Sequence, residues 1–125
     1  MGKDKKIILV IEDDEAIGSM YKNKFESDGF MVLNAATGVE GLEIAKKEKP
    51  DLIMLDIILP QMDGFTVLEK LKKEKNLKKI PVVMLTNLGT EEDKAKGEKL
   101  GAVDYLVKAG LTPAQISKKI KTYIK

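Results

Sequence analysis

The apolar positions of this chain form short continuous runs, separated by stretches in which apolar residues recur every three or four positions. Continuous runs of about five apolar residues are typical of strands buried on both faces of a parallel sheet, whereas the wider spacing is typical of amphipathic helices. The two patterns alternate five times, which predicts a parallel sheet covered by helices on both faces. The predicted strands are 7–11, 31–35, 52–56, 81–86 and 105–107.

Residues with capping chemistry mark the ends of the predicted helices. Thr37 with Glu40 and Thr112 with Gln115 match capping boxes, and Asp63 is a predicted N-cap. The predicted helices are 15–28, one from Thr37 to before Pro50, 64–73, 91–100 closed by Gly101, and one from Pro113 to the C-terminus. The pattern therefore predicts an α/β protein, a three-layer (βα)5 sandwich.

Length and composition exclude several classes of protein. The 125 residues suffice for one domain, and the 22 basic residues, all lysines, face 20 acids for a net charge of +2. This balance gives no case for direct nucleic-acid binding, and the absence of arginine excludes bidentate guanidinium recognition of phosphate. The absence of Cys and His excludes disulfides, thiolate nucleophiles, the usual zinc sites and serine–histidine triads. With no apolar stretch near the roughly 20 residues of a membrane span, we expect a soluble, cytoplasmic protein.

Four of the predicted strands end in reactive side chains. The carboxyl ends of parallel strands meet at one edge of the sheet, where open α/β sheets bind their ligands. We therefore expect acids, a hydroxyl and an ammonium to converge there. The residues concerned are Glu12, Asp13, Asp14, Asp56, Thr86 and Lys108.

These residues and the motifs around them resemble the receiver domain of two-component response regulators. The motifs are ILVIEDD (8–14), DLIMLD (51–56), LPQMDG (59–64), PVVMLT (81–86) and GAVDYLVK (101–108). Each motif alone is weak, but five in this order and spacing are specific. The resemblance covers essentially the whole chain, and it implies a single receiver domain over 1–125 with the flavodoxin-like strand order 2-1-3-4-5.

The resemblance implies a role for each site residue. Asp56 corresponds to the phosphoacceptor, and Thr86 and Lys108 correspond to the pair that holds the phosphoryl oxygens. Tyr105 corresponds to the aromatic side chain that moves on activation. A divalent cation, Mg²⁺ or Mn²⁺, is expected on Glu12, Asp13, Asp56 and the backbone carbonyl of Ile58. Phosphoryl transfer needs mainly positioning and charge neutralisation, which these groups supply.

The implied function is a phosphorylation-dependent signalling switch rather than an enzyme. The expected donor is a histidine kinase or a histidine phosphotransfer protein, docking beside Ile17 and Met20, unless these two residues pack inward. The expected output is a changed surface around the last two helices, read by a downstream protein, by an output domain of the same protein or by a second copy in a phosphorylation-dependent homodimer. Six lysines lie on these helices, where they form either a solvated face or part of that interface: Lys94, Lys96, Lys99, Lys118, Lys119 and Lys121.

The chain departs from the family pattern in two respects. Ala109 follows Lys108 where receivers commonly have a proline after a cis peptide bond; a non-proline cis bond costs about 2.5–4 kcal/mol, so this loop is expected to be strained or differently routed. The positions that flank the acceptor in the family, Ile58 and Leu88, are both apolar. Neither side chain can orient an attacking water, which predicts a long-lived acyl phosphate.

Other interpretations of the same residues remain open at this point. Glu12 and Asp13 could cap the first helix, and Tyr105 could be an ordinary core residue. Two rival functions are a degenerate receiver that acts as a constitutive adaptor and an aspartate-nucleophile phosphohydrolase. The hydrolase lacks its usual acid two residues after the nucleophile, where this chain has Ile58.

Overall fold

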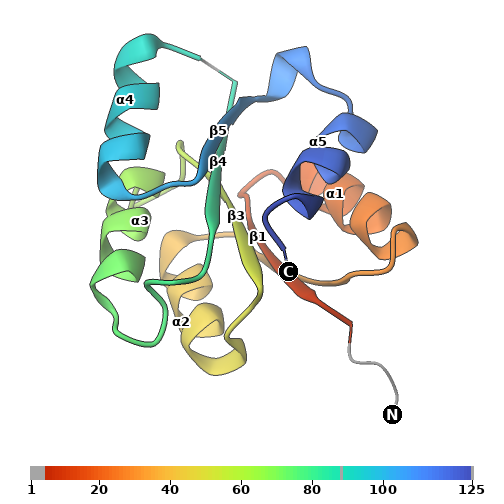
Figure 1. Cartoon of the computed structure of the whole chain (residues 1–125), viewed down its shortest axis with the longest axis horizontal. Helices are drawn as coiled ribbons and strands as arrows, with labels where there is room; N and C mark the ends of the chain where they lie inside the picture. Colours follow the sequence, from red (N-terminus) through yellow and green to blue (C-terminus); the bar gives the residue numbers. More distant parts are fainter. Residues whose placement is uncertain (1–4, 88, 125) are drawn as a thin grey trace.

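A computed structural model describes residues 5–87 and 89–124, and its strands and helices alternate along the chain as predicted (Figure 1). Each predicted strand and helix is present, and the bounds differ from the predicted ones by only a few residues. In chain order the elements are β1 (Ile7–Ile11), α1 (Glu15–Ser27), β2 (Met31–Ala35), α2 (Gly38–Glu48), β3 (Leu52–Asp56), α3 (Gly64–Lys73), β4 (Val82–Thr86), α4 (Glu91–Leu100), β5 (Asp104–Val107), the 3-10 turn η1 (Lys108–Gly110) and α5 (Pro113–Lys121).

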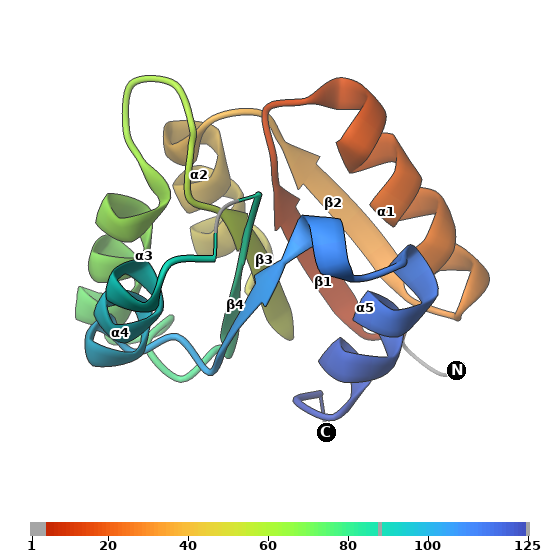
Figure 2. The ribbon, with the colours of Figure 1, turned by 90° about the horizontal axis from the view of Figure 1, so that it is seen from above.

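The five strands form one parallel sheet in the order β2-β1-β3-β4-β5, which confirms the predicted topology. Helices α1 and α5 cover one face, and α2, α3 and α4 cover the other (Figure 2). Neighbouring residues of the central strands point to opposite faces: Leu9 and Ile11 lie in one core cluster, Ile8 and Val10 in the other. A strand that contributes to two cores must be apolar throughout, which explains the continuous runs in the sequence.

Side-chain caps fix where most helices begin. Asp63 accepts a hydrogen bond from the Thr66 N–H at 2.9 Å, and Thr112 with Gln115 forms a complete capping box. The predicted capping box at α2 is only half correct. Thr37 accepts from the Glu40 N–H, but the Glu40 carboxylate reaches one residue further back, to the N–H of Ala36 at 2.8 Å.

Several predicted bounds were wrong. The first helix ends at Ser27 instead of Asp28, and the fifth strand begins at Asp104 instead of Tyr105. The fourth strand begins at Val82, one residue after Pro81, because a proline has no N–H for the strand ladder. The last helix ends at Lys121, after which the chain tightens into i→i+3 turns and leaves Ile124 half-buried against the core. Among the described residues, none of the helices is both long and apolar enough to span a bilayer.

Candidate phosphoacceptor site

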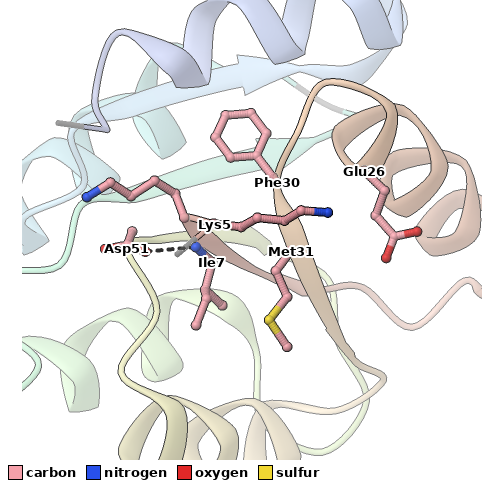
Figure 3. A pocket seen from close by; sticks show the side chains of 7 residues that line it. Lys5, Ile7, Glu26, Phe30, Met31 and Asp51 are labelled. Atoms are coloured by element: carbon pink, nitrogen blue, oxygen red, sulfur yellow. Dashed lines mark hydrogen bonds between the residues drawn. The ribbon is translucent and has the colours of Figure 1, made fainter. Parts of the chain in front are cut away.

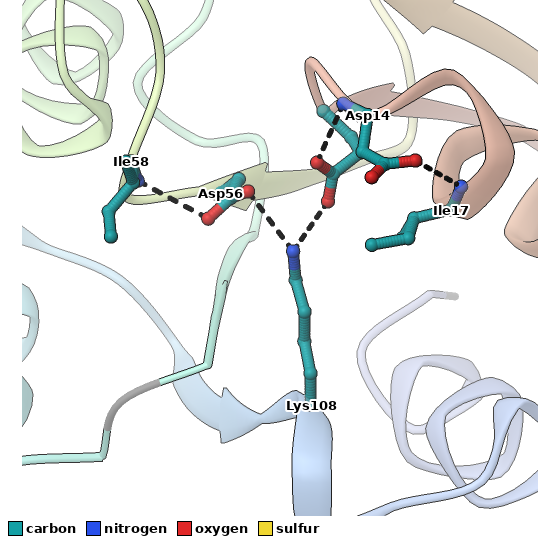
Figure 4. A network of polar contacts seen from close by, with 6 residues as sticks. Asp14, Ile17, Asp56, Ile58 and Lys108 are labelled. Carbon is teal, nitrogen blue, oxygen red and sulfur yellow. Dashed lines mark hydrogen bonds and ion pairs between the residues drawn. The ribbon is translucent and has the colours of Figure 1, made fainter.

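The predicted site residues lie together at the carboxyl ends of β1, β3, β4 and β5. They come from separate strands, and only the parallel sheet brings them to one edge. Figure 4 shows Asp56 of β3 and Lys108 after β5 meeting there. The cavity at this edge has a volume of about 420 Å³. Its lining includes Asp13, Asp56, Ile58, Asn87 and Lys108. Leu88, the second predicted apolar position beside the acceptor, lies outside the described residues.

The three acids in the loop after β1 have different contacts. Asp14 is the N-cap of α1 and accepts from the Ile17 N–H at 3.0 Å. Its own N–H donates to Oε2 of Glu12, also at 3.0 Å. Glu12 is buried and Asp13 is exposed. Because the helix is capped by Asp14, the alternative in which Glu12 or Asp13 caps it is wrong, and both carboxylates are available to the cavity.

Asp56 is the last residue of β3 and is almost completely buried, with 7% of its surface exposed. One carboxylate oxygen, Oδ1, accepts from the Ile58 N–H at 3.3 Å. The other, Oδ2, accepts from the Lys108 ammonium at 3.1 Å. A buried carboxylate requires such partners, since burial of an unpaired charge is costly.

Lys108 reaches two buried acids from the end of β5. Its ammonium donates to Oε1 of Glu12 at 2.6 Å as well as to Asp56 (Figure 4). Burial alone would lower the pKa of Lys108, but the hydrogen bonds and charges of the two acids outweigh it, so the pKa lies above its ordinary value. Burial raises the pKa of Glu12, which the lysine only partly offsets.

Ala109 does not prevent this placement of the lysine. No peptide bond among the described residues is cis, so the Lys108–Ala109 bond is trans. The chain turns through η1 directly after β5, and the lysine side chain reaches back into the site. The sequence left two outcomes open for this loop, strain or a different route. The structure shows a different route.

Three carboxylates are placed to hold a cation. One oxygen each from Glu12, Asp13 and Asp56 lies within 4.8 Å of the others. Neighbouring oxygens around an octahedral Mg²⁺ are about 2.9 Å apart and opposite ones about 4.2 Å apart, so the three carboxylates would draw closer together around a bound ion. Carboxylate oxygens are the hard ligands that Mg²⁺ and Mn²⁺ prefer. The donor set therefore fits the expected cation.

Thr86 ends β4 beside the end of β3 that carries Asp56, and Tyr105 lies on the next strand, β5. Both are buried, with 2% and 8% of their surfaces exposed. Burial raises the pKa of Tyr105, the charge of Asp93 adds to this, and a hydrogen bond with the Thr86 side chain opposes it. The ring of Tyr105 lies against Gly97 of α4, where an added Cβ would be 3.4 Å from Cδ2 of the tyrosine. The two predicted switch residues are thus in contact with each other, and Tyr105 also contacts α4.

The predicted docking residues differ in their environment. Met20 is exposed on α1, with 41% of its surface open to solvent. Ile17 is half-buried, packs against the core cluster under α1 and α5, and also lines the cavity of the site. The patch that the sequence suggested is therefore smaller than expected, and the inward-packing alternative holds in part for Ile17.

A larger cavity, about 890 Å³, lies at the opposite edge of the sheet and contains none of the predicted site residues. Lys5, Phe30 and Met31 are among its lining residues, and the Asp51 carboxylate accepts from the Ile7 N–H there at 2.7 Å (Figure 3). Since this hydrogen bond ties β1 to the start of β3, Asp51 has a structural task. The predicted acids and Lys108 line the smaller cavity instead.

The model of the response regulator receiver domain matches residues 8–121 of this chain. The chain belongs to this family. Receivers are signalling domains, and the family and the fold of this chain are those of a phosphorylation-dependent signalling switch. Neither rival function, constitutive adaptor or phosphohydrolase, is favoured by these findings.

Individual receivers agree with this assignment. The DNA-binding dual master transcriptional regulator RpaA of Synechocystis is 46% identical over 101 residues, which cover 81% of this chain and 42% of that protein. The chemotaxis protein CheY4 of Vibrio cholerae superposes with a TM-score of 0.91 at 29% identity, covering 97% of this receiver and all of that chain. The Mn²⁺-bound response regulator Rcp1 superposes with a TM-score of 0.81 at 27% identity, covering 94% and 92%. The chain spans about half the length of the curated relatives that it matches.

Sequence reasoning missed two features of the receiver site. The first is the Lys108–Glu12 contact, which no local pattern encodes because the two residues are 96 positions apart. The second is Gly64, which packs against the backbone of Asp56. The sequence did hold a signal for this contact: a glycine directly after an N-cap, a position where glycine lowers helix propensity and therefore needs another reason.

Proposed function

We propose that this receiver accepts a phosphoryl group on Asp56 from the phosphorylated histidine of a kinase or a phosphotransfer protein. The observation that carries the proposal is the pair of buried carboxylates, Glu12 and Asp56, joined by the Lys108 ammonium beside the buried Thr86. Two buried acids at the ends of strands cost free energy in an ordinary core. A phosphoacceptor site needs them.

Glu12, Asp13, Asp56 and the carbonyl of Ile58 would hold the divalent cation, Mg²⁺ or Mn²⁺. When bound, such an ion neutralises carboxylate and phosphoryl charge that would otherwise repel. Asp13 lines the cavity and is exposed to solvent, which leaves a path for the ion to enter. The Mn²⁺-bound form of Rcp1, a structure similar to this one, supports the same choice of ion.

The proposed transfer forms one bond and breaks one. A carboxylate oxygen of Asp56 attacks phosphorus, the bond from phosphorus to the donor imidazole nitrogen breaks, and the imidazole keeps the electron pair and is protonated. Lys108 already touches Oδ2 of Asp56, so a small movement of its ammonium would let it bind a phosphoryl oxygen instead. The product is an aspartyl phosphate with added negative charge and acceptor oxygens.

The switch in this proposal is the contact between Thr86 and Tyr105. A phosphoryl oxygen on Asp56 competes for the Thr86 hydroxyl, which weakens the hydrogen bond between Thr86 and the tyrosine. Tyr105 packs against Gly97, so a new position of its ring alters how α4 lies on β5. The surface formed by α4, β5 and α5 would then differ between the two states.

The partners belong to the proposal as well. We expect the phosphodonor to dock on the side of α1 that carries Met20 and the partly exposed Ile17. The changed α4-β5-α5 surface would be read by a downstream protein, an output domain or a second receiver. The cytoplasmic location expected from the sequence stays a prediction.

Phosphoramidate tests the proposal directly, because its N–P bond stands in for phosphohistidine. The native receiver incubated with phosphoramidate and Mg²⁺ is expected to gain one phosphoryl group by intact-mass analysis. Asp56→Asn should gain none, whereas Asp51→Asn, which alters a carboxylate at the opposite edge of the sheet, should be labelled like the native protein. Labelling of Asp56→Asn at the native level, or no labelling of any form, contradicts the proposal.

A further inference from the structure

Gly64 approaches the backbone of Asp56 more closely than any other residue type permits. A Cβ at position 64 would lie 2.2 Å from the carbonyl oxygen of Asp56 and 2.7 Å from Cα of Ile57. Both atoms are main-chain atoms at the end of a central strand, so no change of rotamer relieves the overlap. Only glycine fits between the start of α3 and the end of β3.

One hydrogen bond closes the loop between β3 and α3 into a ring. The Gly64 N–H donates to the carbonyl of Ile57 at 2.7 Å. At the far side of the ring, Gln61 adopts a left-handed conformation with φ of 69°, which turns the chain back. The Asp63 cap on the Thr66 N–H fixes the start of α3 next to it. The ring is therefore held between a buried strand and a capped helix.

Ile58 lies inside this ring, and its N–H faces the acceptor. Its N–H donates to Oδ1 of Asp56 at 3.3 Å (Figure 4), and its carbonyl is one of the proposed cation ligands. Any displacement of Gly64 from Asp56 must move the ring, because the ring begins at Ile57 and ends at Gly64. The carbonyl of Ile58 would then shift relative to the three carboxylates.

From this geometry we infer that Gly64 is a positioning residue of the phosphoacceptor site. Its missing side chain sets the distance between the Ile58 carbonyl and the Asp56 carboxylate, and thereby the affinity for the divalent cation. The inference rests on the proposed function, since it concerns the cation site of that function. It differs from a purely structural role, which would change the stability of the fold and leave cation affinity unaltered.

A comparison of Gly64→Ala with Gly101→Ala distinguishes a positioning role of Gly64 from a purely structural one. Gly101 closes α4 at the other end of the molecule with a φ of 108°, so alanine is strained there too but lies far from the site. Mg²⁺ affinity is measured by titration calorimetry on protein shown to be folded by circular dichroism. We expect Gly64→Ala to weaken Mg²⁺ binding by about tenfold or more, the usual effect of losing a residue that orients a metal ligand. Gly101→Ala should lower the unfolding temperature and keep the native affinity.

A kinetic measurement gives a second criterion. The rate of labelling by phosphoramidate is followed against Mg²⁺ concentration. If Gly64 acts through the cation, Gly64→Ala needs about tenfold more Mg²⁺ for half-maximal rate and approaches the native rate at saturation. Native Mg²⁺ affinity in folded Gly64→Ala overturns the inference and leaves the proposed function intact. Absence of Mg²⁺ binding by the native receiver overturns both.

Amide exchange answers the question if Gly64→Ala fails to fold. In the native receiver, Mg²⁺ bound at the Ile58 carbonyl should tighten the ring and slow hydrogen exchange at the Gly64 N–H. The Gly101 N–H, bonded to the carbonyl of Glu98, serves as the control. Selective slowing at Gly64 supports the inference, and equal change at both amides overturns it.

Discussion

The ammonium of Lys108 lies 2.6 Å from Oε1 of Glu12, closer than its 3.1 Å contact with Asp56. Glu12 is also one of the three carboxylates that could share a cation. We therefore expect the lysine and the divalent cation to compete for this carboxylate. A cation bound through Oε1 would displace the Lys108 ammonium, which would free it for a phosphoryl oxygen.

Lys108→Met should raise Mg²⁺ affinity by about tenfold, because a positive charge next to the cation is removed. In chelator the same variant should be less stable by about 3 kcal/mol, since two buried acids lose their counter-charge. Calorimetry and urea unfolding measure these two effects. Lys22→Met, an exposed lysine at the rim of the neighbouring cavity, is the control. Unchanged Mg²⁺ affinity in Lys108→Met would contradict the competition.

Gly97→Ala should stabilise the receiver. The added Cβ would meet Tyr105, Met84 and Phe65 at 3.4–3.9 Å, which is ordinary contact, and alanine favours the helix by about 0.5–1 kcal/mol. The filled space should also hinder movement of the Tyr105 ring. Thermal unfolding measures the first effect, and tyrosine spectra before and after phosphorylation measure the second. Gly41→Ala, whose Cβ would lie 2.4 Å from Ile11, should destabilise instead.

The hydrogen bond between Ser117 of α5 and Asp28, directly after α1, should contribute less stability in acid. The hydrogen bond from the buried Ser117 hydroxyl, helped by the Lys24 ammonium, lowers the pKa of Asp28 below its ordinary 3.8. A depressed pKa stabilises the folded state above the ordinary value, and this contribution is lost as the pH falls through the lowered one. Ser117→Ala should therefore be less stable than the native receiver at pH 7, with the gap closing below pH 3.8. Ser27→Ala, which alters an exposed hydroxyl, should show no such pH dependence.

Tyr123 should show the opposite pH dependence, because its stabilising contribution is lost as the pH rises. Its hydroxyl donates to Asp104 at 2.7 Å, and this bond raises the pKa of Tyr123 from 10.0 to about 12. The stabilising contribution is complete below pH 10 and is lost as the pH rises through about 12. Tyrosinate absorbance in an alkaline titration should show a late step near that pH. Burial also raises the pKa of Tyr21 and Tyr105, so Tyr123→Phe should reduce the late absorbance change rather than abolish it. A late absorbance change of the native size in Tyr123→Phe would contradict the assignment.

The aspartyl phosphate should be long-lived, since the exposed side chain of Ile58 beside Asp56 offers no group to orient water. Ile58→Gln supplies such a group and should shorten the lifetime by about an order of magnitude, a typical scale for assistance to a single proton transfer. Decay of the label after removal of phosphodonor measures it. Loss within seconds at neutral pH in the native receiver would refute the prediction.

The sequence by itself determined the elements and their arrangement. The strands lie in continuous apolar runs because the central ones contribute to two cores, and residues such as Asp63, Thr112 and Gly101 cap helices through local bonds. Spacing along a strand or a helix encodes such features, so they can be predicted from neighbouring residues alone. The same pattern placed Asp56, Thr86 and Lys108 at one edge of the sheet.

The tertiary structure decided which side chains touch. Lys108 binds Glu12 as well as Asp56, Asp14 rather than Asp13 caps α1, and Gly64 contacts the backbone of Asp56. These relationships depend on side-chain reach and on the approach of segments far apart in the chain. Distances of that kind follow from how helices and loops pack on the sheet, and no local pattern of residues contains them.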